Sequence, residues 1–144
     1  MALLAGMLEG TTIPLMEGDY KPPRAWLPEW RNDPDVLHIY KALQVASDFV
    51  EVANDTWLDE APPQEGMPLT DQARQIQVQA RAADDATHKL VGLLRQIPST
   101  FKTRDPAKRA DLAAQARQYA LQTWRSAKII RELQDKPALA RPRF

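Results

Sequence analysis

Residues 33–60 read DPDVLHIYKALQVASDFVEVANDTWLDE, and this stretch decides the fold class. Asp33 is a suitable N-cap, and Pro34 suits the first helical position, where a missing N–H costs no hydrogen bond. Apolar side chains then recur at steps of three and four, which defines one buried face of a helix. The pattern predicts a helix over residues 34–60 whose core face is Val36, Ile39, Leu43, Ala46, Val50, Ala53 and Trp57.

Two more helices follow by the same reasoning. Thr70 can cap a helix over 71–97 that Pro98 would stop, and Asp105–Pro106 repeats the capped start for a helix over 106–135, before Pro137. A basic loop, residues 99–104, would join them. The core face of the second helix would be Ala73, Ile76, Ala80, Ala83, Thr87, Leu90, Leu94 and Ile97. That of the third would be Leu112, Ala116, Tyr119, Ala120, Thr123, Ala127 and Ile130.

The segments on either side of this region differ in character. Residues 1–32 carry four prolines and the pair Trp26 and Trp30, which predicts an irregular arm. Residues 137–144 form a basic tail that we expect to be loose. Because no segment alternates with period two, the sequence predicts an all-α protein. It would be a single up-down-up three-helix bundle over residues 33–136 with an irregular Pro/Trp-rich N-terminal arm.

The sequence lacks the motifs that are typical of most enzyme active sites. There is no cysteine, and no glycine-rich phosphate loop or nucleophile elbow occurs. His38 and His88 are the two histidines, and His88 has Asp84 and Asp85 at helical spacing. Isolated spacing of this kind favours a helix-paired histidine over a metal site. We therefore expect no enzyme, cofactor, metal or small-molecule substrate.

The hydropathy of the sequence argues against a membrane-spanning segment. No run approaches the roughly 18 apolar residues that span a bilayer. The first residues, MALLAGMLEG, lack a basic region and include Glu9, which makes a poor signal peptide. We expect a cytoplasmic protein.

The formal net charge of +0 conceals an uneven distribution. Residues 1–69 contain 4 Lys/Arg and 12 Asp/Glu, whereas residues 70–144 contain 15 Lys/Arg and 7 Asp/Glu. Either the two halves neutralise each other within the fold, or they present a basic surface to a polyanion and an acidic surface to a basic partner.

The predicted third helix favours the second interpretation, a basic surface that binds a polyanion. At about 100° per residue, four of its cations (Arg117, Arg125, Lys128 and Arg131) and Lys136 fall within roughly 140°, opposite the alanine-rich core face. Trp124 borders this arc, and Asp111 is the one acidic residue between Lys108 and Arg131. Cations suit phosphates, and an aromatic ring among them suits base stacking. The predicted nucleic-acid contacts are Lys102, Arg104, Lys108, Arg109, Arg117, Trp124, Arg125, Lys128 and Arg131.

Two other features indicate protein partners. Four carboxylates follow the expected outer face of the first helix: Asp48, Glu51, Asp55 and Asp59. We interpret them as a docking stripe for a basic surface rather than as a solvated or catalytic face. Trp26 and Trp30 could pack on the chain's own core or clamp a neighbour.

In size, helicity and the Arg117, Arg125, Lys128 and Arg131 face, residues 33–136 resemble the small helical subunit of CRISPR ribonucleoprotein effector complexes. The resemblance implies an antiviral, guide-RNA-bound complex with other subunits as partners. The function we expect is a non-catalytic subunit of a nucleoprotein assembly, bound to RNA or single-stranded DNA and to other subunits, among them further copies of itself. The alternatives are a structural or adaptor protein, such as a virion or scaffold component, and a small protein-binding inhibitor.

Overall fold

The computed structural model describes residues 20–60 and 68–144, and this part of the chain is all-helical, without a strand. A short helix, α2 (Pro28–Arg31), precedes the first long helix, α3 (Pro34–Glu60). α4 (Asp71–Leu94), the short α5 (Ile97–Lys102) and α6 (Pro106–Leu133) follow. The remainder of the expected N-terminal arm, residues 1–19, lies outside the described residues.

All three predicted N-caps are confirmed. The Asp33 carboxylate accepts the N–H groups of Asp35 at 2.9 Å and Val36 at 3.2 Å. The Thr70 hydroxyl accepts the Ala73 N–H at 3.0 Å, and the Asp105 carboxylate accepts the Lys108 N–H at 2.9 Å. Each cap satisfies donors that the first turn of a helix leaves without a partner. The local sequence therefore fixes where each long helix begins.

The predicted core faces are buried almost without exception. Every predicted core residue of the second helix is buried, and only Trp57 and Tyr119 of the other two faces are half-buried. The large side chains gather in a cluster around Ile39, Leu43, Leu90 and Leu112. A smaller cluster around Val50, Ile76 and Ile130 fills the other end. Small side chains on α4 and α6 (Ala80, Ala83, Ala116 and Ala120) are buried between the helices, where they let the backbones approach closely.

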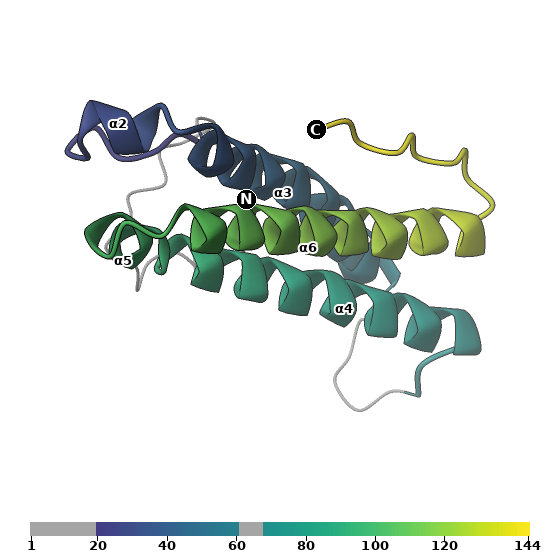
Figure 1. Cartoon of the computed structure of the whole chain (residues 1–144). Helices are drawn as coiled ribbons and strands as arrows, with labels where there is room; N and C mark the ends of the chain where they lie inside the picture. Colours follow the sequence, from purple (N-terminus) through teal and green to yellow (C-terminus); the bar gives the residue numbers. More distant parts are fainter. Residues whose placement is uncertain (1–19, 61–67) are drawn as a thin grey trace.

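The three long helices all pack against one another (Figure 1). Two polar contacts show which ends of the long helices lie close together. Arg109 at the start of α6 reaches Asp33 beside the start of α3. The Gln72 amide, in the first turn of α4, donates to the Leu133 carbonyl at the end of α6 at 2.9 Å. Together these contacts place the start of α6 near the start of α3, and its end near the start of α4.

The connection between the second and third long helices differs from the prediction. α4 ends at Leu94 instead of 97, and residues 97–102, expected mostly as a basic loop, form α5. Pro98 lies in the first turn of α5, where its missing N–H breaks no helical hydrogen bond. Ile97 and Thr100 are buried and anchor this short helix to the bundle. Pro98 thus begins a helix here rather than ending one.

The C-terminal segment, residues 137–144, has no regular secondary structure but is not loose. After α6 the chain reverses and runs back alongside that helix (Figure 1). The reversal is made by Asp135, whose φ is 53°. The Lys136 N–H donates to the Arg131 carbonyl at 2.9 Å, and the Asp135 N–H donates to the Glu132 carbonyl at 3.1 Å. This pair of bonds is a Schellman motif, which closes a helix and redirects the chain.

No helix in residues 20–60 and 68–144 is both long and apolar enough to cross a membrane.

Candidate nucleic-acid interface

The first two predicted cations lie at the last residue of α5 and in the turn between α5 and α6. Lys102 and Arg104 are exposed, and Arg104 has a φ of 54°, in the left-handed region. The Arg104 N–H donates to the Phe101 carbonyl at 3.1 Å, and the Asp105 N–H donates to the Thr100 carbonyl at 2.8 Å. This is a second Schellman closure, with an arginine at the position that usually holds glycine. The end of α5 and this turn thus present two solvent-facing charges.

Lys108 does not join the other cations of α6. It is nine residues before Arg117, which at about 100° per residue places the two side chains on opposite sides of the helix. Its ammonium lies 3.8 Å from the Asp111 carboxylate, and both side chains are largely exposed. Lys108 is therefore not part of one continuous surface with Arg117.

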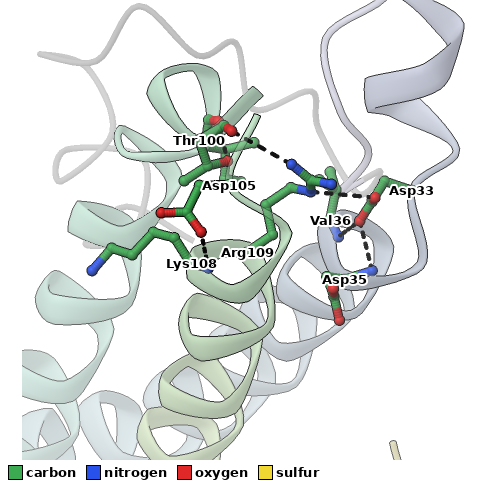
Figure 2. Close-up of polar contacts among 8 residues, drawn as sticks. Asp33, Asp35, Val36, Thr100, Asp105, Lys108 and Arg109 are labelled. Carbon is green, nitrogen blue, oxygen red and sulfur yellow. Dashed lines mark hydrogen bonds and ion pairs between the residues drawn. The ribbon is translucent and has the colours of Figure 1, made fainter. Parts of the chain in front are cut away.

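Arg109 is held inside the fold rather than presented to solvent. Its Nε lies 3.4 Å from the Asp33 carboxylate, and the exposed fractions of the two side chains are 15% and 17%. Its guanidinium also lies over the Phe101 ring, 4.2 Å from the centroid, and Nη1 is 3.5 Å from the Thr100 carbonyl oxygen. Figure 2 shows this side chain reaching from α6 to the capped start of α3. Arg109 joins three parts of the chain, and we drop it from the candidate interface.

The middle of α6 carries the basic face that the sequence predicted. Arg117 and Arg125 are exposed, whereas Lys128 and Arg131 are half-buried. Lys128 lies 3.7 Å from the Glu132 carboxylate. Within the described residues no carboxylate pairs with the guanidinium of Arg117, Arg125 or Arg131. Three cations on one helical face thus keep their charge available.

Trp124 is surrounded by groups that limit its use for base stacking. Its indole N–H donates to the Leu139 carbonyl at 3.2 Å. The Lys128 ammonium and the Arg141 guanidinium lie 5.6 Å and 5.9 Å from the ring centroid. Both distances suit cation–π attraction. In this arrangement Trp124 anchors the C-terminal segment.

The same segment touches α6 at two further points. The Arg131 Nε–H donates to the Pro137 carbonyl at 3.2 Å. At the other end the Phe144 ring lies 5.7 Å from the Arg117 guanidinium and 5.5 Å from the His38 ring on α3. Residues 137–144 therefore follow the predicted basic face from Arg131 to Arg117.

The predicted acidic stripe lies in the open on α3. Asp48, Glu51 and Asp55 are exposed, and none forms an ion pair within the described residues. Partial burial and then the charge of Glu51 raise the pKa of Asp48, while Lys41 lowers it. Asp59 lies in α3, but its side chain is outside the described residues. Asp48, Glu51 and Asp55 are thus like charges that no cation of the described residues pairs directly.

Trp26 and Trp30 are packed within the fold. Their rings meet edge to face at 5.9 Å, and Trp26 meets Tyr40 in the same way at 6.5 Å. Trp30 stacks on Phe101 at 5.0 Å with an interplanar angle of 11°. Both rings are half-buried, so the described part of the arm uses them against the chain's own helices.

His88, Asp84 and Asp85, whose spacing could suit a metal site, have other partners. The Asp84 carboxylate accepts the Asn54 side-chain N–H at 2.9 Å, and His88 Nδ1 lies 2.9 Å from the Asp84 carbonyl oxygen. Asp85 pairs with Lys89 at 3.0 Å. In the part of the chain that the structure describes, no three His, Cys, Asp or Glu side chains are grouped so as to hold a metal ion.

The structure therefore divides the predicted contacts. One face of α6, from its middle to its last turn, carries Arg117, Trp124, Arg125, Lys128 and Arg131, whereas Lys102 and Arg104 lie apart before its start. Sequence reasoning missed Arg141 and Arg143, which are exposed on the segment that lies along α6. Their spacing around Pro142 could have indicated an extended basic strand. It missed the buried position of Arg109, although that residue precedes Leu112 by three and Ala116 by seven and so shares their core face.

Comparison of the chain with models of protein families, with curated proteins and with solved structures finds no match.

Proposed function

We propose that this chain is a non-catalytic helical subunit of a nucleoprotein assembly, and that the middle of α6 contacts a nucleic-acid backbone. The surface fits RNA or single-stranded DNA. The proposal includes an up-down-up bundle of α3, α4 and α6, in which α6 carries the nucleic acid and α3 meets a neighbouring subunit.

The observation that carries the proposal is a set of cations without counter-charges. Arg117 and Arg125 are exposed, and neither they nor Arg131 pair with a carboxylate in the described residues. Two exposed cations of α4, Arg74 and Lys89, do have counter-charges, because Arg74 lies 2.7 Å from Asp71 and Lys89 lies 3.0 Å from Asp85. Unpaired guanidinium groups gain the most from phosphates, whose bound counterions they release.

The acidic stripe supports the second part of the proposal. Partial burial and then the charge of Glu51 raise the pKa of Asp48, and a cationic neighbour would relieve the repulsion between the two carboxylates. If the neighbour is another copy of this chain, an acidic α3 meeting a basic α6 is a heterologous contact that builds rows. This is the arrangement that the resemblance to CRISPR small subunits implies, and we place this chain in a cytoplasmic complex of that kind.

The test is binding of the full chain to labelled single-stranded RNA, single-stranded DNA and duplex DNA at about 50 and about 200 mM salt. Four phosphate contacts to a single strand predict a loss of affinity on the order of 50-fold over this range, because each contact adds about 0.7 to the logarithmic salt slope. Changing Arg117, Arg125, Lys128 and Arg131 together to Gln should abolish most binding.

A matched control removes the same charge from another helix. Arg74, Arg81, Lys89 and Arg95 are exposed on or just after α4, and their change to Gln should leave most of the affinity. Equal losses in both variants would mean that only net charge matters. No binding by the unchanged chain would overturn the nucleoprotein proposal and direct attention to a scaffold or inhibitor that docks protein through α3.

A further inference from the structure

We propose that residues 137–144 form the second half of the nucleic-acid site: the docked segment places Arg141 and Arg143 beside the cations of α6, and the two elements bind one phosphodiester backbone together. This inference rests on the proposed function of α6. It assigns binding residues outside the predicted set, and it gives Trp124 the role of positioning residue rather than stacking platform.

The length of the segment matches the length of the face that it follows. Its contacts on α6 fall at Arg131, Trp124 and Arg117, two steps of seven residues. At about 1.5 Å per residue these positions span about 21 Å of helix. Seven residues of extended chain, from Pro137 to Phe144, span about 22 Å at 3.1 Å per residue, and the two prolines favour that conformation. The segment is thus about as long as the stretch of α6 that it follows.

The contacts that hold the segment pair none of its charges with a carboxylate. α6 grips main-chain carbonyls, those of Pro137 and Leu139, and the segment contributes no carboxylate side chain. Arg141 and Arg143 are exposed, and neither pairs with a carboxylate in the described residues. Arg143 lies between the two anchors at Trp124 and Arg117. Docking therefore brings two more guanidinium groups without carboxylate partners to a face that is already basic, and one of them lies over the Trp124 ring.

Leu121 is a buried side chain on this face, which agrees with a segment docked over it. Leu121 lies four residues after Arg117 and four before Arg125, within the basic arc, yet it is 3% exposed. It belongs to neither of the two core clusters. Because Arg117 and Trp124 on either side of it along the helix both touch the C-terminal segment, we assign its cover to that segment.

Like charges held together predict how the site responds to its ligand. A basic segment on a basic helix is opposed by repulsion among Arg141, Arg143, Arg117 and Arg125. A phosphate backbone between them cancels the repulsion, so nucleic acid and docked segment stabilise each other. An acidic segment would instead imitate the ligand and compete with it. The sign of the charge therefore distinguishes a shared site from an inhibitory cover.

The experiment measures salt dependence of binding by the full chain with both Arg141 and Arg143 changed to Gln. With single-stranded RNA and single-stranded DNA, the loss of two phosphate contacts should lower the logarithmic salt slope by about 1.4. Duplex DNA is the third arm and shows which backbone fits. The matched control changes Arg81 and Arg95 of α4 to Gln, which removes the same charge, and should keep the slope.

A second variant tests the anchoring of the segment without changing charge. Trp124→Phe removes the indole N–H that Leu139 accepts, and it should weaken binding several-fold while the helical circular dichroism and melting temperature stay close to those of the parent. In the parent chain, the Trp124 indole N–H resonance should keep its hydrogen-bonded position when RNA is added.

The outcomes separate this inference from the proposed function. If the α6 variant loses binding but Arg141→Gln with Arg143→Gln keeps the full slope, α6 acts alone and the segment has no part in the site. If Trp124→Phe, or the variant with both Arg141 and Arg143 changed to Gln, binds more tightly, or if RNA shifts the indole resonance to its free position, the segment is a competitor. If the unchanged chain does not bind, the proposed function itself fails.

Discussion

The Arg109 guanidinium contacts two other parts of the chain: the Asp33 carboxylate beside the start of α3, and the Phe101 ring and Thr100 carbonyl of α5. Asp33 is shared between two tasks, since Oδ1 caps α3 and Oδ2 faces Arg109. A cation at this junction ties the start of α6 to the start of α3. Because Arg109 is charged, the sequence predicted a surface position for it. Its spacing of three residues from Leu112 instead places it on the buried face of the helix.

Replacing Arg109 by Met should therefore destabilise the protein. The Asp33 carboxylate would remain mostly buried without its cation, at a cost of about 2–3 kcal/mol in the free energy of unfolding. Urea denaturation measures the loss. Arg125→Met, on the exposed face of the same helix, should change stability by no more than about 0.5 kcal/mol. Equal effects of the two changes would refute a structural role for Arg109.

Asp48 gives a prediction about pH. Partial burial and the neighbouring Glu51 raise the pKa of its carboxyl in the folded protein. The folded state then binds the proton more tightly than the unfolded state, so stability from this group is lost as pH rises above about 4. Asp48→Asn should raise the melting temperature at neutral pH, and the difference should shrink on acidification towards pH of about 4.

The cause of the Asp48 shift can be checked separately. In Glu51→Gln the pKa of Asp48, followed by NMR titration of its carboxyl carbon, should fall because one repelling charge is gone. An unchanged pKa would show that partial burial alone accounts for the shift.

At the scale of whole elements, the sequence predicted what local chemistry determines. The caps Asp33, Thr70 and Asp105 and the period of apolar residues depend on neighbours in the same helix, and all were confirmed. The end of α4 and the path of residues 137–144 depend on contacts between distant segments. The acceptors that hold the C-terminal segment are main-chain carbonyls, which every residue carries and no sequence pattern reveals.

The same limit applied to the candidate site. The arc of Arg117, Arg125, Lys128 and Arg131 follows from helical geometry, so the sequence located it. The contribution of residues 141 and 143 follows from a chain reversal at Asp135, where a non-glycine residue adopts a left-handed conformation that glycine usually supplies. A pattern search for helix ends marked by glycine passes over this turn.

Asp135 also yields a prediction. Asp135→Gly should raise the free energy of unfolding by up to about 1 kcal/mol, because glycine adopts positive φ without steric cost. Asp135→Ala, which removes the charge but keeps a Cβ, should give no such gain. Chemical denaturation of the three proteins side by side measures the difference, and a gain in the alanine variant would assign the effect to charge instead.

At the scale of the whole molecule, the charges are sorted onto different helices, with carboxylates on α3 and guanidinium groups on α6. Among the described residues, one ion pair connects α6 to the start of α3. It joins Arg109 to Asp33 and lies at one end of the bundle. The open stretches of both surfaces therefore remain available to other molecules.

Complementary open surfaces predict self-association that salt suppresses. At about 50 mM salt, sedimentation velocity should detect oligomers that increase with protein concentration, and about 300 mM salt should dissolve them, since the screening length falls below 10 Å. A variant with Asp48, Glu51 and Asp55 changed to Asn and Gln should stay monomeric at both. Oligomers that persist in that variant would show that α3 is not the acidic partner.

The return of the chain along α6 matters for anyone who handles this protein. α6 ends beside the first turn of α4, but Phe144 lies next to His38, near the start of α3. A purification tag or fluorophore attached after Phe144 therefore leaves the molecule over Arg117, not at the far tip of the last helix. A binding assay made with such a fusion would measure obstruction by the label together with the affinity of the protein.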